Sequence, residues 1–99
     1  MLPDLVLKAA SDHDRQPAPF VLTDQQVRAI ALMSARDRRL TLGDLFHIHA
    51  YQELGRMIAP LRMGPHWQRA YLRDWEANGE AYRDYAEGVF ADALRMEAA

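Results

Sequence analysis

The stretch that decides the fold is residues 65–96, PHWQRAYLRDWEANGEAYRDYAEGVFADALRM. Its aromatic and apolar residues recur at intervals of three, four or seven, which places them within about an 80° arc of an α-helix. The members of this stripe are Trp67, Tyr71, Trp75, Tyr82, Tyr85, Val89, Ala93 and Met96. The spacing therefore predicts an amphipathic helix that buries one side.

Asn78 and Gly79 lie in the middle of this stretch, and both residue types favour turns. The apolar pattern nevertheless keeps its phase across them, and this favours one helix of about 48 Å. A globule of this chain length has a radius of gyration near ~13 Å, so we expect such a helix to extend beyond a monomer and to need a partner. The alternative is a pair of helices broken at Asn78-Gly79.

A capping box marks the start of an earlier helix. Thr23 can cap the helix, Gln26 stands at the reciprocal position, and Leu22 and Val27 form a hydrophobic staple. These signals predict a helix from residue 24 to about Arg36.

The capping pattern recurs at Thr41, with Asp44 three residues later. It predicts a second helix over residues 42–59, because Pro60 cannot donate a backbone hydrogen bond. The arginine-rich residues 36–39 are then interpreted as a solvated turn between the two helices.

The first 19 residues form an arm in this interpretation. Residues 2–10 can form a short helix, residues 11–19 contain two prolines and resemble a linker, and residues 20–22 are extended. The predicted fold is all-α: three to four helices, a short N-terminal arm and a long or once-broken C-terminal helix. Residues 1–99 form one domain, with its core in residues 20–99.

The composition fits one globular domain. The chain has 99 residues, of which 49% are hydrophobic and 26% charged, and it has no cysteine, so disulfides and thiolate metal ligands are excluded. No apolar run reaches the ~20 residues that span a bilayer, so no membrane is expected as a partner. The first residues lack the basic region of a secretory signal, and we therefore expect a cytoplasmic protein.

Charge is distributed unevenly along the chain, although the net charge is only −2. Residues 36–73 carry seven arginines against three acidic residues, whereas residues 74–99 carry seven acidic residues against two arginines. The basic middle could steer an acidic partner. Equally, the two regions could attract each other within the fold or across a dimer.

Few residues suggest catalysis or metal binding. His47 and His49 point about 200° apart on a helix, whereas His49 and Glu53 share a face. A zinc site needs further ligands, which only His13 or His66 could supply through a tertiary contact. The two serines lack a nucleophile-elbow motif, and no glycine-rich phosphate loop is present. We expect no enzyme activity, no metal and no cofactor.

The aromatic stripe is the strongest indication of function. Tryptophan and tyrosine bury a large area, keep a polar tip and dominate binding hot spots. Packing against the helices over residues 24–36 and 42–59 is the favoured explanation for most of these side chains. Both interpretations can hold, with Trp67 and Tyr71 directed inward and the residues from Tyr82 onward in a dimer interface. The candidate partner-binding residues are Trp67, Tyr71, Trp75, Tyr82 and Tyr85. The expected function is that of a small helical interaction protein, an inhibitor, adaptor or regulator, which acts by protein–protein contact as a homodimer.

A helix-turn-helix DNA-binding regulator is the alternative. Residues 51–59 would form the first helix, residues 60–64 the turn and residues 65–76 the recognition helix. The side chains facing DNA would be Arg62, His66, Arg69 and Arg73. Three features disfavour this alternative: the turn is long, the proposed recognition helix contains aromatic residues, and the net charge is negative.

Overall fold

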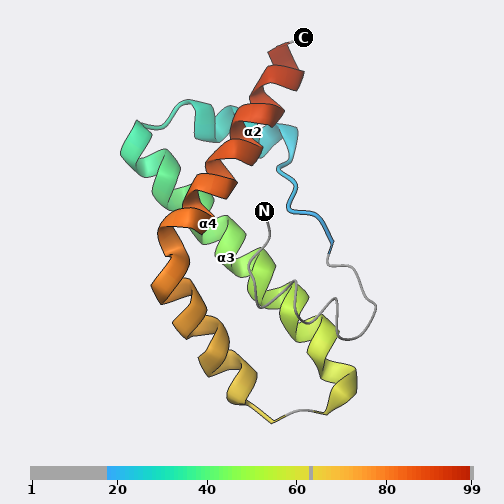
Figure 1. Cartoon of the computed structure of the whole chain (residues 1–99). Helices are drawn as coiled ribbons and strands as arrows, with labels where there is room; N and C mark the ends of the chain where they lie inside the picture. The colour runs from blue at the N-terminus through green and yellow to red at the C-terminus, as the bar shows by residue number, and fades with distance from the viewer. Residues whose placement is uncertain (1–17, 63, 99) are drawn as a thin grey trace.

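The computed structural model describes residues 18–62 and 64–98, and every regular element in these ranges is helical (Figure 1). The order is α2 (Asp24–Ala31), α3 (Ala35–Ile58), the short 3₁₀ helix η1 (Ala59–Leu61) and α4 (His66–Ala98). The predicted all-α fold with a long C-terminal helix is therefore confirmed. The predicted helix over residues 2–10, and most of the predicted linker, lie outside the described residues.

The start of α2 agrees with the sequence prediction. The Thr23 hydroxyl accepts from the Gln26 backbone N–H at 3.1 Å, and the Gln26 side chain accepts from the Thr23 N–H at 2.9 Å. Leu22 and Val27 are both buried, as a hydrophobic staple requires. Phe20 is also buried whereas Val21 is exposed, which is the alternation of an extended segment.

The boundary between α2 and α3 differs from the prediction. The first helix ends at Ala31 rather than near Arg36, and the second starts at Ala35 rather than after Thr41. The reason is Ser34, whose hydroxyl accepts from the Asp37 N–H at 3.2 Å and so caps α3. Asp37 then lies in the first turn, where a negative charge is favourable.

The helices α3 and α4 form an antiparallel hairpin (Figure 1). As predicted, α3 ends just before Pro60, and η1 follows it. Arg62 then adopts a left-handed backbone with φ of 52°, which reverses the chain before α4. The side-by-side arrangement is what brings the aromatic stripe of α4 onto α3.

The helix α4 is continuous over 33 residues, so Asn78 and Gly79 do not break it. The Asn78 amide donates to the Asp74 carboxylate at 2.8 Å, one turn earlier in the same helix. A straight helix of this length would measure about 50 Å, and the longest dimension of the molecule is 43 Å. Figure 1 shows that the axis of α4 changes direction about midway, so that its second half passes α2. The second half of α4 therefore packs in part on α2, whereas Leu94 and Met96 near its end are 41% and 80% exposed.

Two hydrophobic clusters hold the helices together. The first joins the extended segment, α2, the beginning of α3 and the second half of α4, and includes Phe20, Val27, Leu42, Phe46 and Phe90. The second lies in the hairpin between α3 and the first half of α4, and includes Ala50, Leu54, Met57, Ile58 and Tyr71. Trp75 packs against both clusters. It therefore links the two parts of the core.

Candidate interaction site

The aromatic stripe of α4 faces α3, and its rings are buried to different extents. Tyr71 is 0% exposed and Tyr82 is 3% exposed, so these two rings offer almost no surface to a second molecule. Trp67, Trp75 and Tyr85 are only partly buried. Of the five predicted partner-binding residues, these three retain accessible surface. Tyr71 and Tyr82 are instead buried within the domain, which agrees with the packing interpretation of the stripe.

Trp75 is held in place by neighbouring rings. Its ring centroid lies 4.6 Å from that of His47 on α3, 5.2 Å from that of Tyr82 and 6.2 Å from that of Phe46. All three separations are typical of stabilising aromatic pairs. The indole is consequently fixed in orientation while one edge stays accessible.

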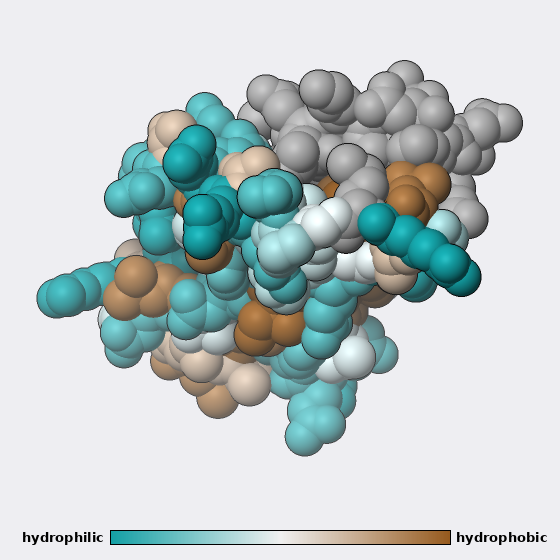
Figure 2. All heavy atoms as spheres, turned by 90° about the horizontal axis from the view of Figure 1, so that it is seen from below, coloured by the Kyte–Doolittle hydropathy of each residue, from teal (hydrophilic) through white to brown (hydrophobic). Residues whose placement is uncertain are grey.

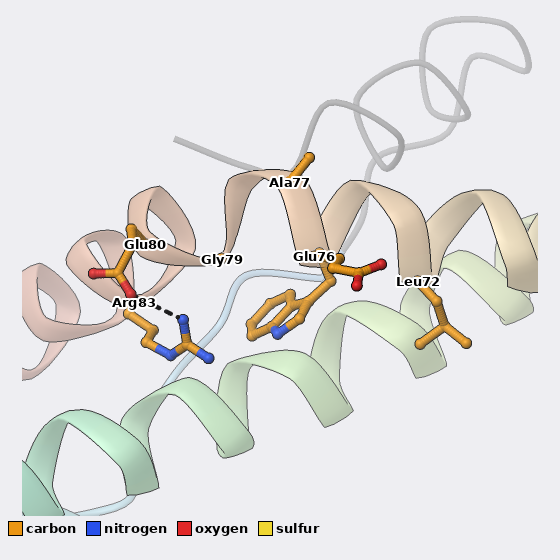
Figure 3. A pocket seen from close by; sticks show the side chains of 7 residues that line it. Leu72, Glu76, Ala77, Gly79, Glu80 and Arg83 are labelled. Carbon is orange, nitrogen blue, oxygen red and sulfur yellow. Dashed lines mark hydrogen bonds and ion pairs between the residues drawn. The ribbon is translucent and has the colours of Figure 1, made fainter.

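That edge lines a surface groove of about 520 Å³ (Figure 3). All the lining residues come from α4: Leu72, Trp75, Glu76, Ala77, Gly79, Glu80 and Arg83. Figure 3 shows Leu72 and Arg83 at opposite ends of the groove. Leu72 is 53% exposed although it is a large apolar side chain. The groove thus combines an aromatic wall, an exposed leucine and charged residues of both signs.

Two glycines make room for Arg83 at the end of the groove. A Cβ atom at Gly43 of α3 would come within 3.0 Å of the Arg83 Cγ, and a Cβ at Gly79 would come within 3.0 Å of its Nη1. The Arg83 stem therefore runs between the two helices, and Nη1 reaches Glu80 at 3.2 Å. A Cβ at Gly43 would press on the stem of the Arg83 side chain, whereas a Cβ at Gly79 would meet only its flexible end.

Arg39 of α3 connects the basic middle of the chain with the acidic end. Its guanidinium forms ion pairs with Glu80 at 2.7 Å, Asp84 at 2.9 Å and Glu87 at 3.1 Å. The hydrogen bonds that Arg39 donates to Glu80 and Asp84 raise the pKa of Arg39 further above its usual range. Part of the charge asymmetry in the sequence is thus an attraction within the fold.

The four residues of the DNA-binding alternative are all exposed: Arg62, His66, Arg69 and Arg73. Within residues 18–62 and 64–98, none of the three arginines has a carboxylate ion pair. Their scaffold, however, differs from a helix-turn-helix, in which short helices cross at about 90–120°. Here α3 and α4 are long helices that lie antiparallel (Figure 1). The structure therefore offers an exposed basic patch without the predicted recognition-helix geometry.

His49 and Glu53 share a face of α3, as predicted, and both bind the polypeptide at Ala18. The Glu53 carboxylate accepts from the Ala18 N–H at 2.6 Å and from the Arg56 Nε at 2.8 Å. The His49 Nε2 lies 2.9 Å from the Ala18 carbonyl oxygen, to which it can donate. No group of three potential metal ligands occurs in the part of the chain that the structure describes. The pair fixes the start of the extended segment against α3.

His47 is tied to Tyr71 across the hairpin. The Tyr71 hydroxyl lies 3.0 Å from both the carbonyl oxygen and the Nδ1 of His47. One arrangement satisfies both contacts: the hydroxyl donates to the carbonyl, and the Nδ1–H donates to the hydroxyl oxygen. Burial lowers the pKa of His47 and raises that of the Tyr71 hydroxyl. Both shifts favour the neutral forms of the two side chains.

Sequence reasoning did not find the charged and small residues around Trp75. Gly43 was a detectable signal, because a glycine inside a helix often marks a close approach of another element. Leu72 and Glu76 lie outside the arc of aromatic residues on α4 that marks the predicted partner-binding residues.

No protein-family model, no curated protein and no solved structure matches this chain. Among the described helices, none combines the length and apolar character needed to cross a membrane.

Proposed function

We propose that the chain is a small, cytoplasmic, non-catalytic interaction protein, acting as an inhibitor, adaptor or regulator through the Trp75 groove. The observation that carries this proposal is the exposed Leu72 beside the fixed edge of Trp75, with Arg83 at the other end. Tryptophan and arginine are the residue types that contribute most to protein–protein binding energy. A preordered ring also loses little conformational entropy when a partner binds.

The groove is a better candidate than the hairpin end of the molecule. Figure 2 looks onto that end and shows mainly hydrophilic side chains, with hydrophobic areas that are separate and small. Over the part of this face that the structure describes, an approaching partner would meet mostly hydrophilic side chains. The groove instead places Trp75 and Leu72 beside charged groups, which is the combination of an apolar centre and a polar rim found in interfaces.

A photo-crosslinking residue at position 72 tests this proposal. We expect it to form a covalent adduct with a polypeptide, either a second copy or another protein, when introduced into the full chain in its native cells. The matched control is the same residue at position 32, because Leu32 is exposed at the end of α2 and lies outside the groove. Mass spectrometry identifies the adducts. Equal adducts at both positions, or none at either, would refute the proposal.

DNA binding is the second candidate function, and the exposed, unpaired Arg62, Arg69 and Arg73 favour it. Fluorescence anisotropy with duplex DNA measures it. A DNA-binding role requires an affinity that falls steeply with added salt, and a lower salt slope after the double change Arg69→Ala and Arg73→Ala. No binding at low salt would remove this candidate.

A further inference from the structure

The charges beside the Trp75 groove form a pattern that is complementary to itself. Arg69, Arg73, Glu76 and Glu80 are all exposed. At 100° per residue they fall within about a 60° arc on one flank of α4. The first two are basic and the last two are acidic. The midpoint between Arg69 and Glu80 is also the midpoint between Arg73 and Glu76.

From this pattern we infer that the groove binds a second copy of the chain, with the two α4 helices antiparallel and a two-fold axis beside residues 74 and 75. In this register Arg73 of each copy faces Glu76 of the other, and Arg69 faces Glu80. A two-fold interface repeats every contact, so two unlike pairs become four. The inference rests on the proposed function and names its partner.

The apolar residues obey the same symmetry. Leu72 and Ala77 share the midpoint of the charged pairs along α4, and both line the groove. At 100° per residue they lie on opposite sides of the charged flank, so each flanks the contact rather than facing the other. Leu72 lies about 70° from the middle of the charged flank, on the side of the groove. When the two flanks face each other, the exposed Leu72 side chain of one copy therefore lies against the edge of the other copy's groove at Glu76. Burial of this leucine on both sides of the axis supplies a hydrophobic contribution that the charges then orient.

Two of the spacings within this flank are unfavourable in a lone helix, whereas Arg73 and Glu76, three residues apart, carry opposite charges. Arg69 and Arg73 are four residues apart, as are Glu76 and Glu80, and like charges at this spacing repel. Glu80 is compensated within the chain by Arg39 and Arg83. Arg69, Arg73 and Glu76 have no ion pair among the described residues. The inner pair, Arg73 with Glu76, is thus the one that a second copy completes most fully.

Charge reversal tests the inferred register with the purified full chain. Light scattering or sedimentation measures the mass at low salt over a range of concentrations. We expect a dimer for the unaltered chain. Arg73→Glu and Glu76→Arg should each weaken it by roughly tenfold to a hundredfold, since each change makes two contacts repulsive. The double variant should restore the dimer, because the two charges are exchanged.

Arg36→Glu is the matched control, because Arg36 is an exposed arginine on α3, outside this flank. It should leave the dimer unchanged, and circular dichroism should show equal helix content in all variants. A monomer at every concentration, equal dimers in the single variants, or no restoration in the double variant would overturn the inference. A monomeric chain that still crosslinks another protein through position 72 would overturn this inference alone. The proposed function would then stand.

Discussion

Tyr71 has a fully buried ring and a hydroxyl that contacts two atoms of His47. Removing the hydroxyl leaves a buried carbonyl without that partner, while the ring packing stays intact. We expect Tyr71→Phe to lower the free energy of unfolding by about 1–2 kcal/mol. Urea denaturation measures this loss.

Tyr85→Phe is the control for this change. Tyr85 is only partly buried, and no hydrogen bond of its hydroxyl is present within the described ranges. Tyr85→Phe should lower the free energy of unfolding by less than about 0.5 kcal/mol. Equal effects of the two substitutions would show that the contact with His47 contributes nothing.

Glycine positions in the helices differ in the space around them. A Cβ atom at Gly88 would have no neighbour within 4 Å, so Gly88→Ala should raise the free energy of unfolding by about 0.5–1 kcal/mol through helix propensity. At Gly43 the Cβ would meet three atoms of the Arg83 side chain, the nearest at 3.0 Å. Gly43→Ala should therefore raise the free energy of unfolding by less than Gly88→Ala does, or should lower it. Parallel urea titrations compare the two variants, and equal gains would contradict the close packing of Arg83.

At the scale of elements, local signals predicted some helix ends and not others. The capping box at Thr23, the proline after α3 and the aromatic period of α4 each act through neighbours in sequence, and all three predictions agree with the structure. Ser34 and Thr41 both match a cap pattern. Packing of the following turns decides between them: the Arg38 guanidinium lies 5.4 Å from the centroid of the Phe90 ring on α4.

The candidate site was predictable only in part. The period of α4 identified Trp75, because a ring that repeats in phase must face the core. It did not identify Leu72, Glu76 or Arg83, since their place depends on how α4 lies against α3. Tyr71 and Tyr82 share the same period, so the period alone could not distinguish the buried rings from the accessible ones.

The contact between Glu53 and the extended segment makes stability depend on pH. The hydrogen bond from Arg56 is the main cause that lowers the pKa of Glu53 below its ordinary value of 4.5. Above pH 4.5 the ionised Glu53 carboxylate contributes its full stabilisation to the folded state. This stabilisation is lost as the pH falls through the lower value in the folded state, because the unfolded chain binds the proton first.

Glu53→Gln should therefore reduce the loss of stability as the pH falls below 4.5. Urea denaturation at several pH values measures this. His47 contributes in the same direction at a higher pH: its pKa is lowered from 6.5, so its contribution begins to fall below that pH. Unchanged acid sensitivity in the glutamine variant would assign the effect to other groups.

At the scale of the whole molecule, both hydrophobic clusters share the same two long helices. Leu42 is completely buried in the first cluster, whereas Trp67 packs against the second. Leu42→Ala should cost about 2–5 kcal/mol. Because α3 and α4 run through both clusters, the variant should unfold in a single transition. The urea midpoint measured by tryptophan fluorescence should therefore equal the midpoint measured by circular dichroism, and both should be lower than those of the unaltered chain. Separate midpoints would show that the hairpin unfolds independently.

All the residues that line the Trp75 groove lie between positions 72 and 83 of one helix. The recognition surface is thus encoded in about three consecutive helical turns, and tertiary packing only orients them. Substitutions in α2 or the extended segment can change the stability of the folded state without changing the residues of that surface. This separation lets the scaffold and the binding specificity evolve under different selective pressures.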